Sequence, residues 1–123
     1  MLKIIDYLLL TLYCGLIYWL SDQQTLPAPH WFDFQDKAHH AIAYALMAYF
    51  AWRCLRNSIK KPIILGLTII VFCSLYGASD EWHQSFVIGR NSSVGDWVAD
   101  TLGALLMVLL IFKLSFFQPK NSV

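Results

Sequence analysis

The chain has 123 residues, of which 58% are hydrophobic and only 14% are charged, against about 25% charged residues in a typical soluble domain. This composition excludes an ordinary soluble domain and predicts an integral membrane protein, and the net charge of +1 gives no indication of a nucleic-acid partner. Because a bilayer core of about 30 Å requires about 20 apolar residues per helix, the chain has room for four spans in a single domain, residues 1–123.

The first two apolar segments are expected to cross the membrane as helices. Residues 4–20 follow Lys3, as in a signal peptide, but they are rich in aromatic side chains and have no small-residue cleavage site. We therefore expect them to remain as the first span. The second span, residues 36–55, follows a loop that contains two prolines. Asp33 is placed to act as its N-cap residue.

The last two spans begin with recognisable helix-start signals. Residues 62–86 open at Pro62, a residue that suits the first turn of a helix. Residues 95–116 follow a turn at Gly89, and Ser93 and Asp96 have the spacing of a capping box. The sequence therefore predicts an all-α membrane protein, a compact bundle of four transmembrane helices with both termini on the same side.

The basic residues are distributed unequally between the two ends of this bundle. Seven of the nine Lys and Arg residues fall at the end that carries the termini, and only Lys37 and Arg90 fall at the other. Lys and Arg are retained on the cytoplasmic side of short loops. Both termini are therefore expected in the cytoplasm, and most of the acidic residues are expected at the extracytoplasmic end.

Polar residues recur at helical spacing near that end of three predicted helices. Residues three or four positions apart share one face of an α-helix. This spacing relates the members of three sets: Asp36, His40 and Tyr44; Asp80, His83 and Gln84; Asp96 and Asp100. Because an acidic side chain that faces lipid costs at least about 2.5 kcal/mol on insertion scales, the three faces are expected to converge. Glu81, about 100° around the helix from Asp80, is expected to face interfacial water.

The convergence predicts a polar site with an excess of negative charge. Only Lys37 and Arg90 oppose the acidic candidates, which are Asp36, Asp80, Glu81, Asp96 and Asp100. Such a site binds a cation, protonates a histidine or keeps some of its carboxyl groups neutral. Two histidines among carboxylates suit a divalent metal such as zinc or manganese, although the sequence has no recognised metal-ligand spacing.

Two strings carry a resemblance to a known family. The first is Asp36-Lys37-x-x-His40-x-x-x-Tyr44. The second is Tyr76-Gly77-x-x-Asp80-Glu81-x-His83-Gln84-x-Phe86-x-x-Gly89-Arg90-x-x-Ser93-x-x-Asp96-x-x-x-Asp100-x-x-Gly103. Their order and spacing closely resemble the VanZ-like family of small polytopic bacterial membrane proteins. The resemblance implies a place in the bacterial inner membrane and a role in the cell envelope. The family's namesake is associated with teicoplanin resistance.

Several functions remain open for the polar site. The protein is either an enzyme that acts on a lipid-linked envelope intermediate, such as a polyprenyl phosphate or a peptidoglycan precursor, or a module that binds or transports an ion or head group. A purely structural membrane partner is a further alternative. The catalytic candidates are Asp80, His83, His40 and Asp100, and the substrate-binding candidates are Lys37, Arg90, Asp36, Glu81, Gln84, Asp96 and Tyr44. Arg90 is expected to hold a phosphate, since guanidinium binds this group through two hydrogen bonds.

Overall fold

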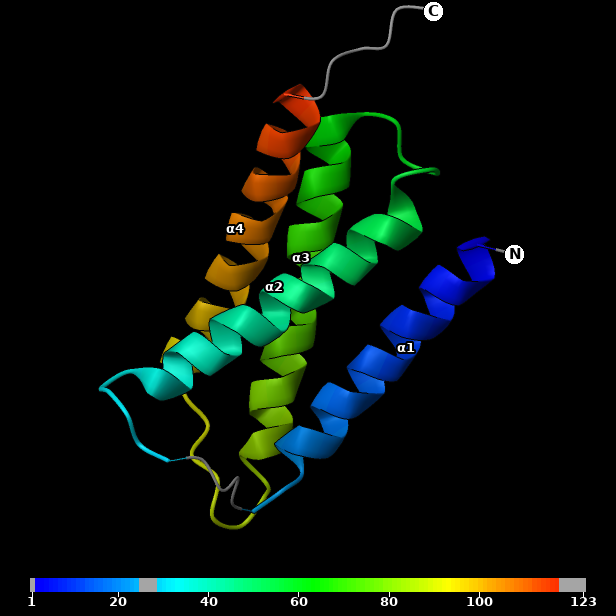
Figure 1. The fold of residues 1–123 in the computed structure, drawn as a ribbon. Helices are drawn as coiled ribbons and strands as arrows, with labels where there is room; N and C mark the ends of the chain where they lie inside the picture. Colours follow the sequence, from blue (N-terminus) through cyan, green and yellow to red (C-terminus); the bar gives the residue numbers. More distant parts are fainter. Residues whose placement is uncertain (1, 25–28, 118–123) are drawn as a thin grey trace, which may run out of the picture.

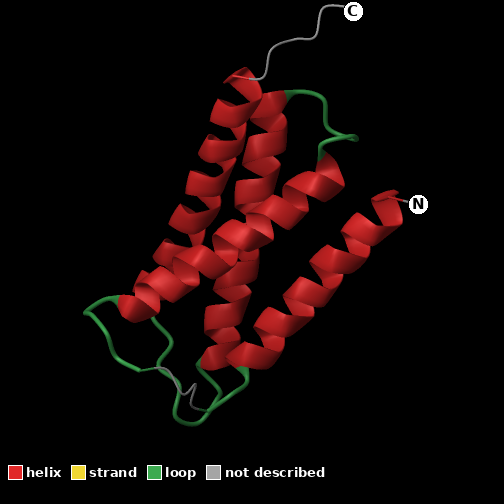
Figure 2. Cartoon of the chain, viewed as in Figure 1, coloured by secondary structure: helices red, strands yellow, loops and turns green. Residues whose placement is uncertain are grey.

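The computed structural model describes residues 2–24 and 29–117, and these residues form α-helices and no strands (Figures 1 and 2). The helices are α1 (Leu2–Ser21), α2 (Gln35–Leu55), α3 (Pro62–Gln84) and α4 (Val94–Phe117). The all-α bundle predicted from the sequence is confirmed. Each helix begins and ends within two residues of its predicted bounds.

The helices differ in how clearly they qualify as membrane spans. Among the described residues, α1, α3 and α4 are long and apolar enough to cross a bilayer by length and composition. The sequence predicts four spans, and α2 is the exception, because Asp36, Lys37, His39 and His40 occupy its first turns. With 21 residues, α2 still has the length that a bilayer requires.

The polar residues are gathered at one end of the bundle. The first turn of α1 and the last turn of α4 lie at one end, and the connection between α3 and α4 lies at the other (Figure 1). The segment before α2 also lies at that second end. Helix α2 runs between α1 and α4 and makes its most extensive contact with α4. The starts of α2 and α4 therefore meet the end of α3.

Small residues let α2, α3 and α4 approach closely, as is common in membrane helix bundles. A Cβ atom at Gly103 of α4 would collide with the backbone oxygen of Ala41 in α2. A Cβ atom at Gly77 of α3 would lie 2.8 Å from Oδ2 of Asp100. The packed interior beneath these contacts includes Tyr44, Met47, Ile69 and Cys73. The backbones are thus close where the polar side chains meet.

Helix α1 is joined to the others through apolar packing around Ile17 and through polar contacts. Three of them are Tyr13 Oη donating to the Ala43 oxygen at 2.7 Å, Tyr76 Oη donating to the Cys14 oxygen at 2.6 Å, and Arg53 Nη2 lying 2.5 Å from Asp6 Oδ1. In a bilayer such groups have no water to return to, so their pairing favours the docked position of α1.

The start of α2 differs from the sequence prediction. Phe34, and not Asp33, is the N-cap residue, and it has a left-handed backbone with φ of 64°. Among the described residues, no side chain caps the helix. Instead, the Gln35 side chain accepts a hydrogen bond from the Trp31 N–H at 2.8 Å and donates one to the Pro29 oxygen at 2.8 Å. These bonds within the loop take the place of a cap and fix how the chain enters α2.

The close approach of α2 and α4 gives a testable prediction. Gly103→Ala places a methyl group against the Ala41 backbone. Because a backbone atom cannot move aside by changing rotamer, the substitution should lower the free energy of unfolding by about 1–3 kcal/mol or more. Thermal unfolding in detergent, followed by circular dichroism, measures the effect. Gly15→Ala is the matched control, because a Cβ atom there meets nothing within 4 Å. Equal stability of the two variants would contradict the packing.

Candidate functional site

The polar end of the bundle is centred on the imidazole of His40 in α2. Its Nδ1 atom lies 2.8 Å from Oδ1 of Asp100 in α4 and 3.9 Å from Oε1 of Glu81 in α3. On the opposite edge of the ring, Nε2 lies 4.0 Å from Oδ2 of Asp96 in α4. One histidine therefore faces carboxylates from two neighbouring helices.

These carboxylates are removed from solvent. Asp100 is 0% exposed, Asp96 3% and Glu81 6%. Lys37 Nζ lies 2.5 Å from Asp96 Oδ1, and among the described residues no other lysine or arginine pairs with this group. Oδ2 of Asp100 and Oε1 of Glu81 have no hydrogen-bond partner in the described structure. A buried carboxylate oxygen without a hydrogen-bond partner is unfavourable. A bound proton or cation would therefore stabilise the cluster.

The position of Glu81 corrects the expectation that it faces interfacial water. Its Oε2 atom accepts a hydrogen bond at 2.9 Å from the backbone N–H of Ser93, just before α4. This bond turns the side chain into the bundle, where only 6% of the residue is exposed. A tertiary contact thus decides the orientation of Glu81, and helical spacing within α3 alone does not contain this information.

The start of α4 places Asp96. As predicted, the Ser93 hydroxyl accepts a hydrogen bond at 3.0 Å from the Asp96 N–H. In a full capping box the Asp96 side chain would in turn accept from the Ser93 N–H. That N–H is instead bonded to Glu81. The Asp96 carboxylate is therefore left to face Lys37 and His40.

Asp80 belongs to a second buried group, beside the His40 cluster. Its Oδ2 atom accepts hydrogen bonds from the Tyr44 hydroxyl at 3.3 Å and from Gln84 Nε2 at 3.5 Å. All three residues are buried. Helical spacing predicts that Asp80 and Gln84 share a face, and the contact with Tyr44 joins that face to α2.

His83 lies apart from the His40 cluster and faces α1. Its Nε2 atom is 3.2 Å from Asp22 Oδ1, its Nδ1 atom is 3.3 Å from Ser21 Oγ, and its ring stacks on Tyr18 with centroids 4.6 Å apart. Asp80 and His83 both line a cavity of about 320 Å³ beside α1 and α3. In the described residues, His83 has no contact with His40 or Asp100.

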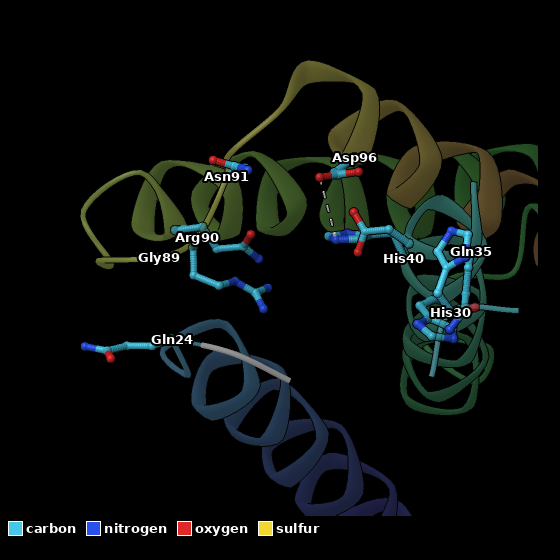
Figure 3. A pocket seen from close by; sticks show the side chains of 11 residues that line it. Gln24, His30, Gln35, His40, Gly89, Arg90, Asn91 and Asp96 are labelled. Atoms are coloured by element: carbon cyan, nitrogen blue, oxygen red, sulfur yellow. Dashed lines mark ion pairs between the residues drawn. The ribbon is translucent and has the colours of Figure 1, made fainter. Parts of the chain in front are cut away.

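The cluster opens into a cavity of about 390 Å³ (Figure 3). Arg90 extends into this cavity from the turn between α3 and α4, while His40 and Asp96 lie on its far side. A smaller cavity of about 130 Å³ shares several of these residues and reaches Tyr44 and Asp80 between the helices. The polar end of the bundle therefore offers a space large enough for a small polar group.

Several residues that line the larger cavity were not among the site residues predicted from the sequence: Gln24, His30, Gln35, His39 and Asn91. His39 is three residues after Asp36, and this spacing was a usable signal. The other four lie in or next to connections whose course depends on tertiary contacts. For example, a Cβ atom at Gly89 would lie 3.3 Å from the Gln24 backbone oxygen.

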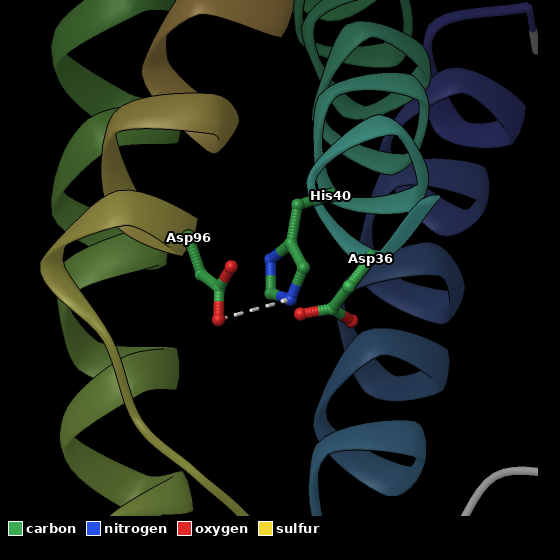
Figure 4. A group of neighbouring side chains, drawn as sticks. All are labelled: Asp36, His40 and Asp96. Carbon is green, nitrogen blue, oxygen red and sulfur yellow. Dashed lines mark ion pairs between the residues drawn. The ribbon is translucent and has the colours of Figure 1, made fainter. Parts of the chain in front are cut away.

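Two sets of side chains have the composition of a metal site. Figure 4 shows the first, in which the His40 ring lies between Asp36 and Asp96. The second consists of His40, Glu81 and Asp100. In each set the potential ligand atoms lie within 4.8 Å of one another. The two sets use opposite edges of the same imidazole.

Comparison with known families decides the family of this chain. A sequence model for VanZ/LLP1 matches residues 14–117. The chain belongs to the VanZ/LLP1 family. The match confirms the resemblance predicted from the two strings and covers the end of α1 together with all of α2, α3 and α4. No curated protein and no solved structure matches the chain.

Membership of the VanZ/LLP1 family and the apolar helices together establish a membrane-embedded protein of VanZ type. Most of the residues predicted for its site contact one another or line the cavities described above. They are Asp36, Lys37, His40, Tyr44, Asp80, Glu81, Gln84, Arg90, Asp96 and Asp100. His83 lies apart from the His40 cluster, because it is held against α1, and it lines only the cavity beside α1 and α3.

The cap of α4 gives a second testable prediction. Ser93→Ala removes the hydroxyl that accepts the Asp96 N–H, and should lower the free energy of unfolding by about 0.5–2 kcal/mol. Ser92→Ala is the control, since Ser92 is exposed and its side chain makes no hydrogen bond in the described structure. Thermal unfolding in detergent compares the two. A loss of the same size in both variants would show that the Ser93 cap has no particular importance.

Proposed function

We propose that this VanZ/LLP1 protein binds the phosphate-bearing head group of a lipid-linked cell-envelope intermediate in the cavity at its polar end. The observation that carries the proposal is Arg90, which lines the cavity and, among the described residues, forms no ion pair. A guanidinium group binds phosphate through two parallel hydrogen bonds. Asn91, His39 and Gln24 line the same space and add groups that hydrogen-bond to phosphate or sugar oxygens.

The proposed orientation places this cavity outside the cell. Seven of the nine Lys and Arg residues are predicted from the sequence to lie at the end that carries the termini, which favours that end as cytoplasmic; one of the seven, Lys120, lies outside the described residues. The cavity then opens at the outer leaflet of the bacterial inner membrane. Lipid-linked precursors of the cell envelope present their head groups on this side, so a contribution to teicoplanin resistance is consistent with the proposal.

A lipid needs a lateral route as well as a head-group site. The cavity of about 320 Å³ beside α1 and α3 is lined by aromatic side chains, and Asp80 lines both this cavity and the smaller central one. Helix α1 has only sparse contact with α3. These features support an approach of the lipid between α1 and α3, with its apolar chain left in the bilayer.

Catalysis is the more demanding form of the proposal. His40 Nδ1 is hydrogen-bonded to Asp100 at 2.8 Å, which is the way a carboxylate orients a histidine that acts as a general base. The Nε2 atom of the same ring faces the cavity lining at Asp96. His40 is therefore the catalytic candidate with the best-supported geometry. Binding or transport without chemistry uses the same cavity and remains the alternative.

Lipid binding gives the third testable prediction. Purified protein in nanodiscs should bind a polyprenyl phosphate and not the corresponding polyprenol. Arg90→Gln should weaken this binding about 10- to 100-fold, because a hydrogen bond to a charged group contributes about 1.5–3 kcal/mol. Arg56→Gln is the control, since Arg56 lies at the opposite end, over the ring of Trp52 at 4.6 Å. Equal affinity for the phosphate and the alcohol, or equal effects of the two variants, would refute the proposal.

The same preparation distinguishes an enzyme from a binding module. Release of phosphate or of a head group by the unaltered protein, lost in His40→Gln, would establish an enzyme. Binding without turnover in the unaltered protein would favour a binding or transport module. Flux measurements in proteoliposomes then distinguish transport from binding alone.

A further inference from the structure

We infer that His40, Glu81 and Asp100 together bind a divalent transition-metal ion. The inference rests on the proposed function in one respect, because the metal ion would offset the negative charge of the cavity and so allow it to hold an anionic head group. The binding of the ion itself requires no lipid. The donor set of one imidazole nitrogen and carboxylate oxygens suits manganese or zinc better than magnesium or calcium, which prefer oxygen ligands alone.

The distances are close to those of a bound site. Ligand atoms held at about 2.0–2.2 Å from one ion lie roughly 3–3.5 Å from each other. Here His40 Nδ1 lies 2.8 Å from Asp100 Oδ1 and 3.9 Å from Glu81 Oε1. The candidate ligand atoms all lie within 4.8 Å of one another. Small side-chain movements bring them to bonding geometry, with the ion in place of the proton between His40 and Asp100. His40 then serves as a metal ligand and not as a general base.

A second observation points independently to a ligand at this position. Oε1 of Glu81 has no hydrogen-bond partner in the described structure, although only 6% of the residue is exposed. Oε1 of Glu81 faces the histidine ring. Lys37 is engaged with Asp96 and is bonded to neither Glu81 nor Asp100. Two buried carboxylates thus share one imidazole, and a doubly charged cation satisfies both.

The surroundings of the ring support this choice of edge. A histidine that binds metal through one nitrogen commonly donates its other N–H to a carboxylate, which fixes the ring. His40 Nε2 faces Asp96 Oδ2 at 4.0 Å, and Lys37 holds Asp96 from its other oxygen. The alternative set, on the Nε2 edge, depends on Asp36, which is exposed, and on Asp96, which already has its cation.

The ion would also resolve an electrostatic conflict in the proposed function. The cavity presents Asp36 and Asp96 in addition to Arg90, so an incoming phosphate meets negative charge as well as positive. A divalent ion below the cavity neutralises Glu81 and Asp100 and attracts the phosphate, in the way that metal ions stabilise phosphoryl oxygens in many enzymes.

The test measures metal binding without lipid. Protein purified with a histidine-free tag is stripped with a chelator and dialysed against Mn²⁺ or Zn²⁺ alone, and bound metal is counted by mass spectrometry. One ion per chain is expected. Glu81→Gln and Asp100→Asn should each weaken binding at least about tenfold. The matched control is Asp36→Asn, which removes a carboxylate from the other edge of the ring and should leave the affinity unchanged.

Three results would overturn the inference. They are the absence of a stoichiometric ion in the unaltered protein, full affinity in Glu81→Gln, and loss of the ion in Asp36→Asn alone. If Asp100→Asn does not fold, the metal affinity of Glu81→Gln decides the test. Circular dichroism checks that each variant is folded. A metal-dependent rise in Tm is expected only for the unaltered protein. Metal binding without any binding of polyprenyl phosphate would reject the proposed function and leave the metal site standing.

Discussion

The structure depends on one histidine that is shared by carboxylates from two other helices. His40 projects from α2 toward Glu81 of α3 and toward Asp96 and Asp100 of α4, and all three acids are nearly or fully buried. Without these contacts each carboxylate would be an isolated charge near the edge of a bilayer, at a cost of several kcal/mol. The cluster therefore joins α2, α3 and α4 through polar contacts, in addition to their close backbone packing.

The backbone around this cluster is adapted to it. Gly77 makes room for the carboxylate of Asp100, and Gly103 brings α4 against the backbone of α2 one turn further along. The Ser93 N–H binds Glu81 and so releases Asp96 from its usual role at a helix start. Because the same atoms that position the site also close the bundle, a change in one is expected to affect the other. Arg90 lines the cavity and is outside this closed network, which suits it to contact a ligand.

The sequence predicts the helices well because apolar length and helix-start residues are local signals. It also predicts that Asp36, His40 and Tyr44 share a face, since that follows from helical spacing alone. Glu81 and His83 show the limit: Glu81 is turned inward by the Ser93 backbone, and His83 is drawn to α1 by Asp22, Ser21 and Tyr18. Both outcomes depend on residues distant in sequence. The loop residues Gln24 and His30 were missed for the same reason.

We propose that the cavity beside the His40 cluster holds the phosphate of an envelope lipid. An experimental structure determined with a short-chain polyprenyl phosphate tests it most directly. We expect phosphate density within hydrogen-bonding distance of the Arg90 guanidinium, on the side of the cavity that faces His40 and Asp96. The lipid chain is expected to leave between α1 and α3. Phosphate density at the opposite end of the bundle, near Lys60 and Lys61, with the cavity beside His40 closed by side chains, would contradict it.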